Sequence, residues 1–170
     1  MKSFVKIILL MGISLVLLMG CSKEKVYEEK YIGRELRIAV LGEIPNIREE
    51  QIKFEKVDFE NIENISSSEN YDAIFVMKEN LNEASKDKYK DIYSNSKATF
   101  FFIDSEKGKI PFMIKGVSYE EAEKIETFSY IVSLEKNGSS TGFGLYNDEK
   151  TQKNIEDCYS TAFKYISELK

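Results

Sequence analysis

Six polar side chains that could bind a ligand follow the apolar runs of this sequence, where predicted strands end. They are Glu43 and Asn46, Lys78 and Asn80, and Asp104 and Ser105. In open α/β sheets, ligands bind outside the carboxyl ends of the strands. We therefore take these residues as candidates for a ligand-binding site, with the alternative that they are ordinary turn and helix-cap residues.

Catalysis at these positions is restricted by composition. The sequence has no histidine, which excludes Ser-His-Asp and Cys-His centres. A Ser–Lys pair remains open, because Ser105 and Lys107 follow a Phe-rich run beside Asp104. A deep pocket lined by these three residues would favour a hydrolase, whereas a flat, partly apolar surface would favour a binding module. We favour a non-catalytic protein.

No cofactor or metal ion is expected from the motifs. Gly142-Phe143-Gly144 begins like a dinucleotide fingerprint but lacks the third glycine, since position 147 is Asn. Neither Cys-x-x-Cys nor EF-hand spacing occurs. Cys158 lies on an apolar helical stripe, and we expect it to be a buried, inert thiol.

The other cysteine ends an N-terminal segment with the pattern of a secretory signal. Lys2 and Lys6 form a basic start, and the apolar run Ile7–Met19 leads to a small residue, Gly20. The run is shorter than the roughly 20 residues that a membrane-spanning helix needs. The segment therefore predicts export followed by cleavage.

The four residues Leu18-Met19-Gly20-Cys21 resemble a bacterial lipobox. The resemblance implies cleavage before Cys21 and a diacylglycerol thioether on its sulfur, with fatty-acid chains such as palmitate. It also implies a lipoprotein held on the extracytoplasmic face of the cell membrane, with the lipid bilayer as a partner.

The net charge argues against nucleic-acid binding. The chain has 24 basic and 29 acidic residues; without Lys2 and Lys6 of the signal, 22 basic residues remain and the formal charge is −7. Backbone phosphates require a basic face, so we expect a protein or small-molecule partner of unknown identity and no nucleic acid.

Three segments follow from composition. We predict a signal peptide at 1–20, a lipidated cysteine with a flexible, charged tether at 21–35, and a single α/β domain at 36–170. The alternative for the tether is that its apolar side chains, Val26, Tyr27, Tyr31 and Ile32, dock on the domain.

The domain alternates between strand-like and helical patterns. Continuous apolar runs at 36–41, 71–77 and 98–103 predict strands buried on both faces, and the alternating run 52–59 predicts an edge strand. Asn80 and Glu83 form a capping-box pattern for a helix reaching about Asn95. The run 110–114 predicts a short edge strand, because it contains Pro111.

The C-terminal part predicts a hairpin and a helix. Asn137-Gly138 separates the strand-like runs 129–135 and 141–146, a strong hairpin signal. A helix with one apolar face should begin near Asn147 or Asp148. Its apolar residues are Ile155, Cys158, Tyr159, Ala162, Phe163, Ile166 and Leu169.

We therefore expect an α/β fold with a mostly parallel central sheet flanked by helices, an antiparallel C-terminal hairpin and a C-terminal helix. It resembles a flavodoxin-like or Rossmann-like three-layer sandwich, or one lobe of an extracytoplasmic solute-binding protein. The domain also resembles small uncharacterised lipoproteins of Bacillus-type bacteria, which implies no activity.

The function that we expect is that of a membrane-anchored extracytoplasmic binding or interaction module. Two alternatives stay open. One is a His-independent extracytoplasmic hydrolase, and the other is a ligand sensor or accessory lipoprotein of a transporter.

Overall fold

Six strands form one mixed sheet in the order β2-β1-β3-β4-β5-β6. Strands β1 to β4 are parallel, and β5 and β6 add antiparallel strands at one end, which confirms the α/β fold with a mostly parallel sheet. The predicted edge strand, β2, does lie at the other end of the sheet. The strands are β1 Leu36–Leu41, β2 Ile52–Lys56, β3 Ala73–Val76, β4 Thr99–Ile103, β5 Ile131–Leu134 and β6 Gly142–Phe143.

The computed structural model describes residues 29–125 and 129–169. The predicted signal peptide, the lipobox and Cys21 lie outside these ranges. No helix within the ranges has the length and apolar character needed to cross a membrane.

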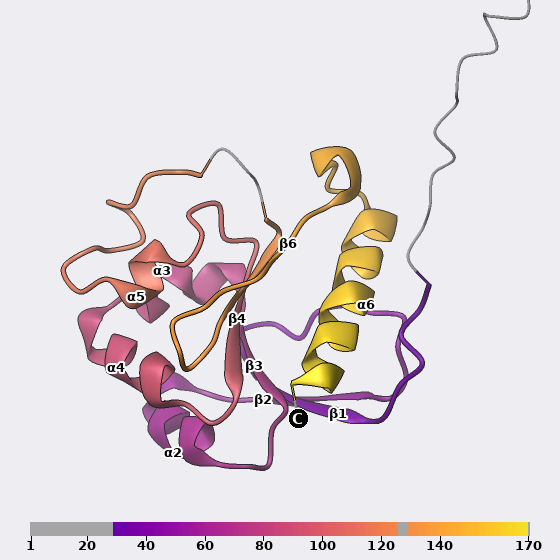
Figure 1. Cartoon of the computed structure of the whole chain (residues 1–170), viewed down its shortest axis with the longest axis horizontal. Helices are drawn as coiled ribbons and strands as arrows, with labels where there is room; N and C mark the ends of the chain where they lie inside the picture. The colour runs from indigo at the N-terminus through magenta and orange to yellow at the C-terminus, as the bar shows by residue number, and fades with distance from the viewer. Residues whose placement is uncertain (1–28, 126–128, 170) are drawn as a thin grey trace, which may run out of the picture.

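Helices cover both faces of the sheet, as Figure 1 shows, with α6 on one side and the remaining helices on the other. The α-helices are α2 Ile62–Ser67, α3 Leu81–Ala84, α4 Asp87–Asn95, α5 Ile110–Met113 and α6 Gln152–Glu168, and the 3-10 turns are η1 Phe59–Asn61, η2 Lys78–Asn80 and η3 Tyr146–Asp148. Successive residues of a strand point to opposite faces, so each buried strand contributes to two cores. Phe75 packs under α6, while its neighbour Ile74 packs under the other helices.

The C-terminal helix α6 is the main cover of its face. Cys158 and Phe163 are buried, and the Phe163 ring stacks on Phe75 with centroids 6.3 Å apart. Leu169, the last predicted member of the apolar face, is 37% exposed. The helix begins at Gln152 rather than near Asn147, which has a positive φ of 52°. A left-handed residue cannot continue a right-handed helix.

Two helix and strand predictions were wrong. The run 110–114 is not an edge strand, because Pro111 occupies the first turn of α5, where its missing N–H costs no hydrogen bond. The predicted helix from Asn80 to Asn95 is two helices, since the backbone at Lys86 is extended. The Asn80 side chain makes no cap hydrogen bond.

The core extends into the predicted tether. Tyr31 is buried, and its N–H donates to Glu49 Oε1 over 3.3 Å. Gln51 Nε2 donates to the Tyr31 carbonyl over 2.5 Å. Ile32, in contrast, is 88% exposed. The docking alternative therefore holds for Tyr31, five residues before the predicted start of the domain, and fails for Ile32.

Candidate functional site

Five of the six predicted ligand-binding residues lie at the carboxyl edge of the parallel strands, close behind the ends of β1, β3 and β4. Strands β1, β3 and β4 run in the same direction, so the segments that follow them meet at one edge of the sheet. Glu43, Lys78, Asn80, Asp104 and Ser105 all belong to these segments. Their contacts divide them into two groups.

The first group fills the space between the ends of β1 and β3. Glu79 Oε1 accepts a hydrogen bond from the Glu43 N–H over 2.7 Å, and Glu43 forms a 2.7 Å ion pair with Lys56. The hydrogen bond from Lys56 lowers the pKa of Glu43. Gly42 has a φ of 125°, and a Cβ there would lie 2.4 Å from Glu79 Oε1. A carboxylate therefore occupies the turn where an α/β sheet could receive a phosphate.

The second group is centred on Asp104, directly after β4. Its carboxylate bridges Lys78 at 2.8 Å and Lys150 at 2.6 Å. The hydrogen bond to Asp104 raises the pKa of Lys78. Asp104 has a φ of 56°, a left-handed conformation that Asp tolerates better than most residues. The two ion pairs join the ends of β3 and β4 to the segment before α6.

A hollow of about 180 Å³ lies beside this second group, and Asp104 and Lys78 line it. Ser105 does not line it: this residue is fully buried, and its hydroxyl donates to the Gly108 carbonyl over 3.4 Å. Lys107 Nζ donates to the Glu120 carbonyl over 2.8 Å. No Ser–Lys pair is formed between them. A separate hollow of about 260 Å³ lies beside Glu43. Asn46 is exposed in the β1–β2 connection and lines neither hollow.

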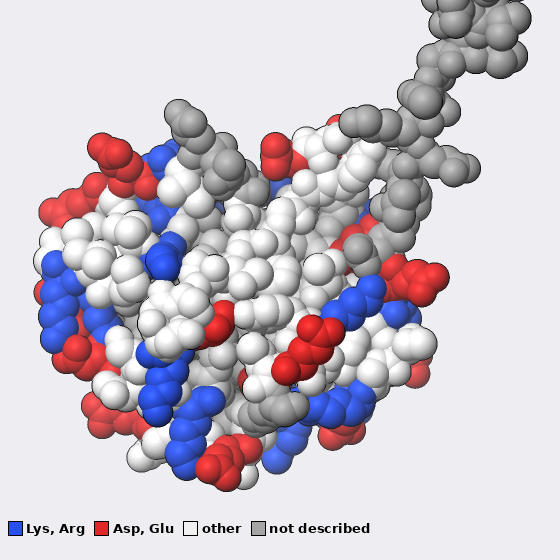
Figure 2. All heavy atoms as spheres, in the orientation of Figure 1, with Lys and Arg blue, Asp and Glu red and all other residues white. Residues whose placement is uncertain are grey.

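Charges of both signs are spread over the surface. On the face drawn in Figure 2, basic and acidic side chains alternate around the periphery, and neither sign forms a large continuous patch. Most are paired locally, as in the exposed pairs Lys115–Asp91 at 2.7 Å and Lys97–Glu69 at 3.0 Å. In the described ranges, no group of three or more His, Cys, Asp or Glu residues could hold a metal ion.

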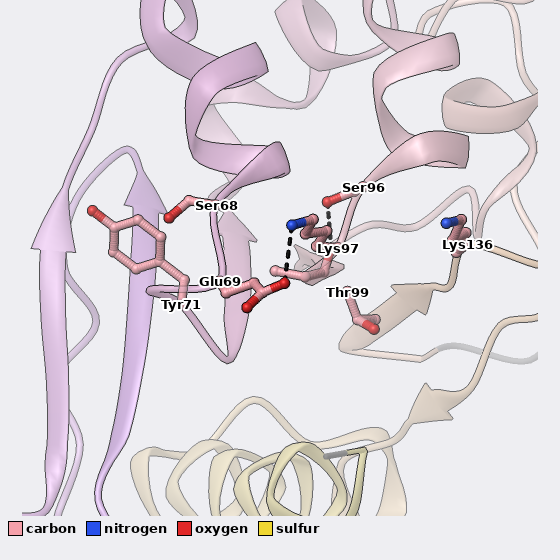
Figure 3. A pocket seen from close by; sticks show the side chains of 8 residues that line it. Ser68, Glu69, Tyr71, Ser96, Lys97, Thr99 and Lys136 are labelled. Carbon is pink, nitrogen blue, oxygen red and sulfur yellow. Dashed lines mark hydrogen bonds and ion pairs between the residues drawn. The ribbon is translucent and has the colours of Figure 1, made fainter.

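A larger hollow lies at the opposite, amino edge of the sheet and was not predicted. It has a volume of about 670 Å³ and is formed by three segments far apart in the sequence (Figure 3). These are the turn 68–71 before β3, the turn 96–99 before β4, and Lys136 in the β5–β6 turn. No motif marks it, because no single segment carries more than a few of its residues.

Sequence reasoning also missed a buried polar cluster under the N-terminal segment. The Glu49 side chain has no exposed area, and Oε1 accepts from Ser160 Oγ on α6 over 2.5 Å. Arg48 Nη1 lies 2.8 Å from Asp157, and Nη2 donates to Ser160 Oγ over 2.8 Å. Together with the Tyr31 N–H, these contacts hold the N-terminal segment, the β1–β2 connection and α6 together. The partners are too far apart in sequence to form a recognisable motif.

Comparison of the chain with protein families, with curated proteins and with solved structures finds no match.

Proposed function

We propose that this protein is a lipoprotein anchored through Cys21 to the extracytoplasmic face of the cell membrane, where its domain acts as a non-catalytic binding module. The anchoring rests on the lipobox-like Leu18-Met19-Gly20-Cys21 and the preceding basic and apolar segment. A lipid anchor suits a domain whose acidic charge would otherwise be repelled from an anionic bilayer surface.

The binding role rests on the environment of the residues that could have formed a hydrolase. The hollow beside Asp104 contains neither Ser105 nor Lys107, and each of these two donates to a backbone carbonyl instead. A nucleophile must lie within hydrogen-bond reach of its base, and the described residues provide no such pair here. The hollows at the two edges of the sheet have linings of mixed polar and apolar character, which suits reversible binding better.

The strand order supports a flavodoxin-like architecture, whereas the turn after β1 does not suit a flavin site. The order β2-β1-β3-β4-β5 is the flavodoxin-like order. This chain departs from that pattern because β5 is antiparallel and no helix joins β1 to β2. Glu79 also occupies the turn after β1 with a negative charge. We therefore propose the flavodoxin-like architecture without a phosphate-bearing cofactor.

Anchoring is tested by replacing the proposed lipid acceptor. Cells expressing the wild-type chain with labelled palmitate should give a labelled protein in the membrane fraction. The Cys21→Ala variant should lose the label and stay unprocessed. Cys158→Ala is the matched control and should keep the label, because it removes the other thiol. Persistent labelling of Cys21→Ala would overturn the lipoprotein proposal.

A further inference from the structure

The outer edge of β2 presents a row of unpaired backbone groups. Strand β2 ends the sheet and pairs with β1 on one side only. It has five residues and no proline, whereas β6 at the other end has two residues and is too short to be a good template. From the backbone and side chains of β2 we infer that the protein forms a two-fold dimer, in which the β2 strands of two copies pair antiparallel and join the two sheets.

Every second residue of β2 directs its backbone away from β1. The Val57 N–H, just after β2, donates to the Val40 carbonyl of β1 over 2.9 Å, so residue 57 faces β1. Backbone groups alternate in direction along a paired strand. The residues that direct their N–H and C=O groups outward are therefore Ile52, Phe54 and Lys56. The hydrogen bonds among residues 29–125 and 129–169 leave these outward groups unused.

An antiparallel arrangement with its two-fold axis at Phe54 uses all of these groups. In this register Phe54 faces Phe54 of the second copy, and Ile52 faces Lys56 of the second copy. Each facing pair exchanges two backbone hydrogen bonds, so the interface contains roughly six. Phe54 is only partly buried in the single copy, and the two rings lie on the same face of the joined sheet. Contact between them would therefore stabilise the dimer further.

Charge complementarity selects this register. Lys53 and Glu55 are exposed and lie on the face of β2 opposite to Phe54. With the axis at Phe54, each Lys53 faces Glu55 of the other copy. An axis at residue 53 or 55 would instead oppose two lysines or two glutamates, which is destabilising. Glu55 lies 3.6 Å from Arg37, but this pair is exposed and costs little to rearrange. The alternating signs on β2 therefore favour a second copy of the same strand as its partner.

Sedimentation equilibrium of the full chain in density-matched detergent tests the dimer. The wild type should dimerise in a concentration-dependent manner. Lys53→Glu and Glu55→Lys should each weaken the dimer about tenfold, because each turns both facing pairs into like charges. An equimolar mixture of the two variants should dimerise like the wild type, since every facing pair between unlike chains then has opposite charges. Lys115→Glu reverses an exposed lysine after α5 and is the control, which should leave the dimer unchanged.

Disulfide formation tests the register. Two differently tagged chains, one with Lys53→Cys and one with Glu55→Cys, should cross-link on oxidation, because facing residues of this kind have Cα atoms about 4.5 Å apart. Lys53→Cys chains alone should not cross-link, since two copies of residue 53 are diagonal neighbours at roughly 7–8 Å. Chains without a new cysteine give the background.

Three results would overturn the dimer. One is a wild-type chain that stays monomeric up to about 1 mM, which corresponds to a binding free energy weaker than about −4 kcal/mol. Another is a pair of charge variants that dimerise like the wild type, or whose mixture dimerises no better than its components. The third is cross-linking of Lys53→Cys chains alone, which would reject the register. None of these measurements requires lipid on Cys21, so a failure of the dimer is distinguishable from a failure of the proposed anchor.

Discussion

At the scale of single residues, burial and pairing account for the behaviour of the polar and titratable groups. Cys158 is buried on α6, and its Sγ lies 3.5 Å from the Phe143 carbonyl. Glu49 is buried but shares hydrogen bonds with Tyr31 and Ser160. Glu83 is near the surface and is surrounded by donors. Each environment leads to a measurable consequence.

The Cys158 thiol should be inert in the native protein. Burial raises the pKa of Cys158 to about 12, so almost no thiolate exists at neutral pH and few reagents reach the sulfur. In the Cys21→Ala variant, where Cys158 is the only thiol, a disulfide reagent should react slowly until denaturant is added. Fast labelling of the native variant would place Cys158 at the surface.

Removing the Glu49 carboxylate should destabilise the domain strongly. Glu49→Ala leaves the buried Tyr31 N–H without its acceptor and removes the carboxylate 3.6 Å from Arg48 Nε, while Ser160 Oγ keeps the Glu156 carbonyl as an acceptor. The expected cost is about 3 kcal/mol in the free energy of unfolding. Urea denaturation measures this value. The adjacent, exposed Glu50 is the control, and Glu50→Ala should change stability by less than about 0.5 kcal/mol. Equal effects of the two variants would show that the cluster is not structural.

Glu83 should contribute to the acid sensitivity of the fold. The hydrogen bond from Lys86, aided by Tyr89, lowers the pKa of Glu83 from 4.5 to about 2. A lowered pKa stabilises the folded state above pH 4.5, and this stabilisation disappears as the pH falls towards 2. The melting temperature of Glu83→Gln should therefore fall less than that of the wild type between pH 4.5 and 2. High salt should reduce the difference, because the group is near the surface; an unchanged pH profile would contradict this role.

At the scale of elements, the sequence predicted correctly those turns that a short local motif specifies. Asn137-Gly138 forms the predicted turn, with Gly138 at a φ of 80° and the Ser139 N–H donating to Asn137 Oδ1 over 2.7 Å. Pro111 misled the prediction, because an apolar run with proline fits both an edge strand and a first helical turn. Flanking left-handed glycines at 108 and 116 accompany the short helix α5.

The two candidate sites differ in how far the sequence could predict them. The carboxyl edge was predictable, because residues such as Lys78 and Asp104 directly follow parallel strands. The pairing of Asp104 with Lys150 was not, since it depends on where the segment before α6 passes. The amino-edge hollow and the contact between Glu49 and Ser160 arise only when distant segments pack together.

The packing of α6 is the element-scale property most open to test. The Phe163 ring is fully buried against Phe75, so Phe163→Ala should lower the free energy of unfolding by about 3–5 kcal/mol. Leu169→Ala changes a half-exposed residue just after the same helix and should cost less than about 1 kcal/mol. Denaturation curves that coincide for Phe163→Ala and the wild type would mean that α6 does not cover the sheet in solution.

At the scale of the whole molecule, different sets of helices pack on the two faces of the sheet. One face carries α6 and the Tyr31 segment, and the other carries four short helices. Hollows open at both edges of the sheet, while ion pairs occupy most of the charged side chains around them. This arrangement suits a module that presents a surface to a ligand while its N-terminal segment leads to the membrane anchor that we propose.

The most direct test of the account is the mass of the mature N-terminal peptide from membrane-extracted protein. The account predicts that the chain begins at Cys21, that residues 1–20 are absent, and that the peptide carries the mass of a diacylglycerol group on the cysteine. A peptide that begins at Met1, or an unmodified Cys21 in the membrane-extracted protein, would contradict the proposed lipid anchor.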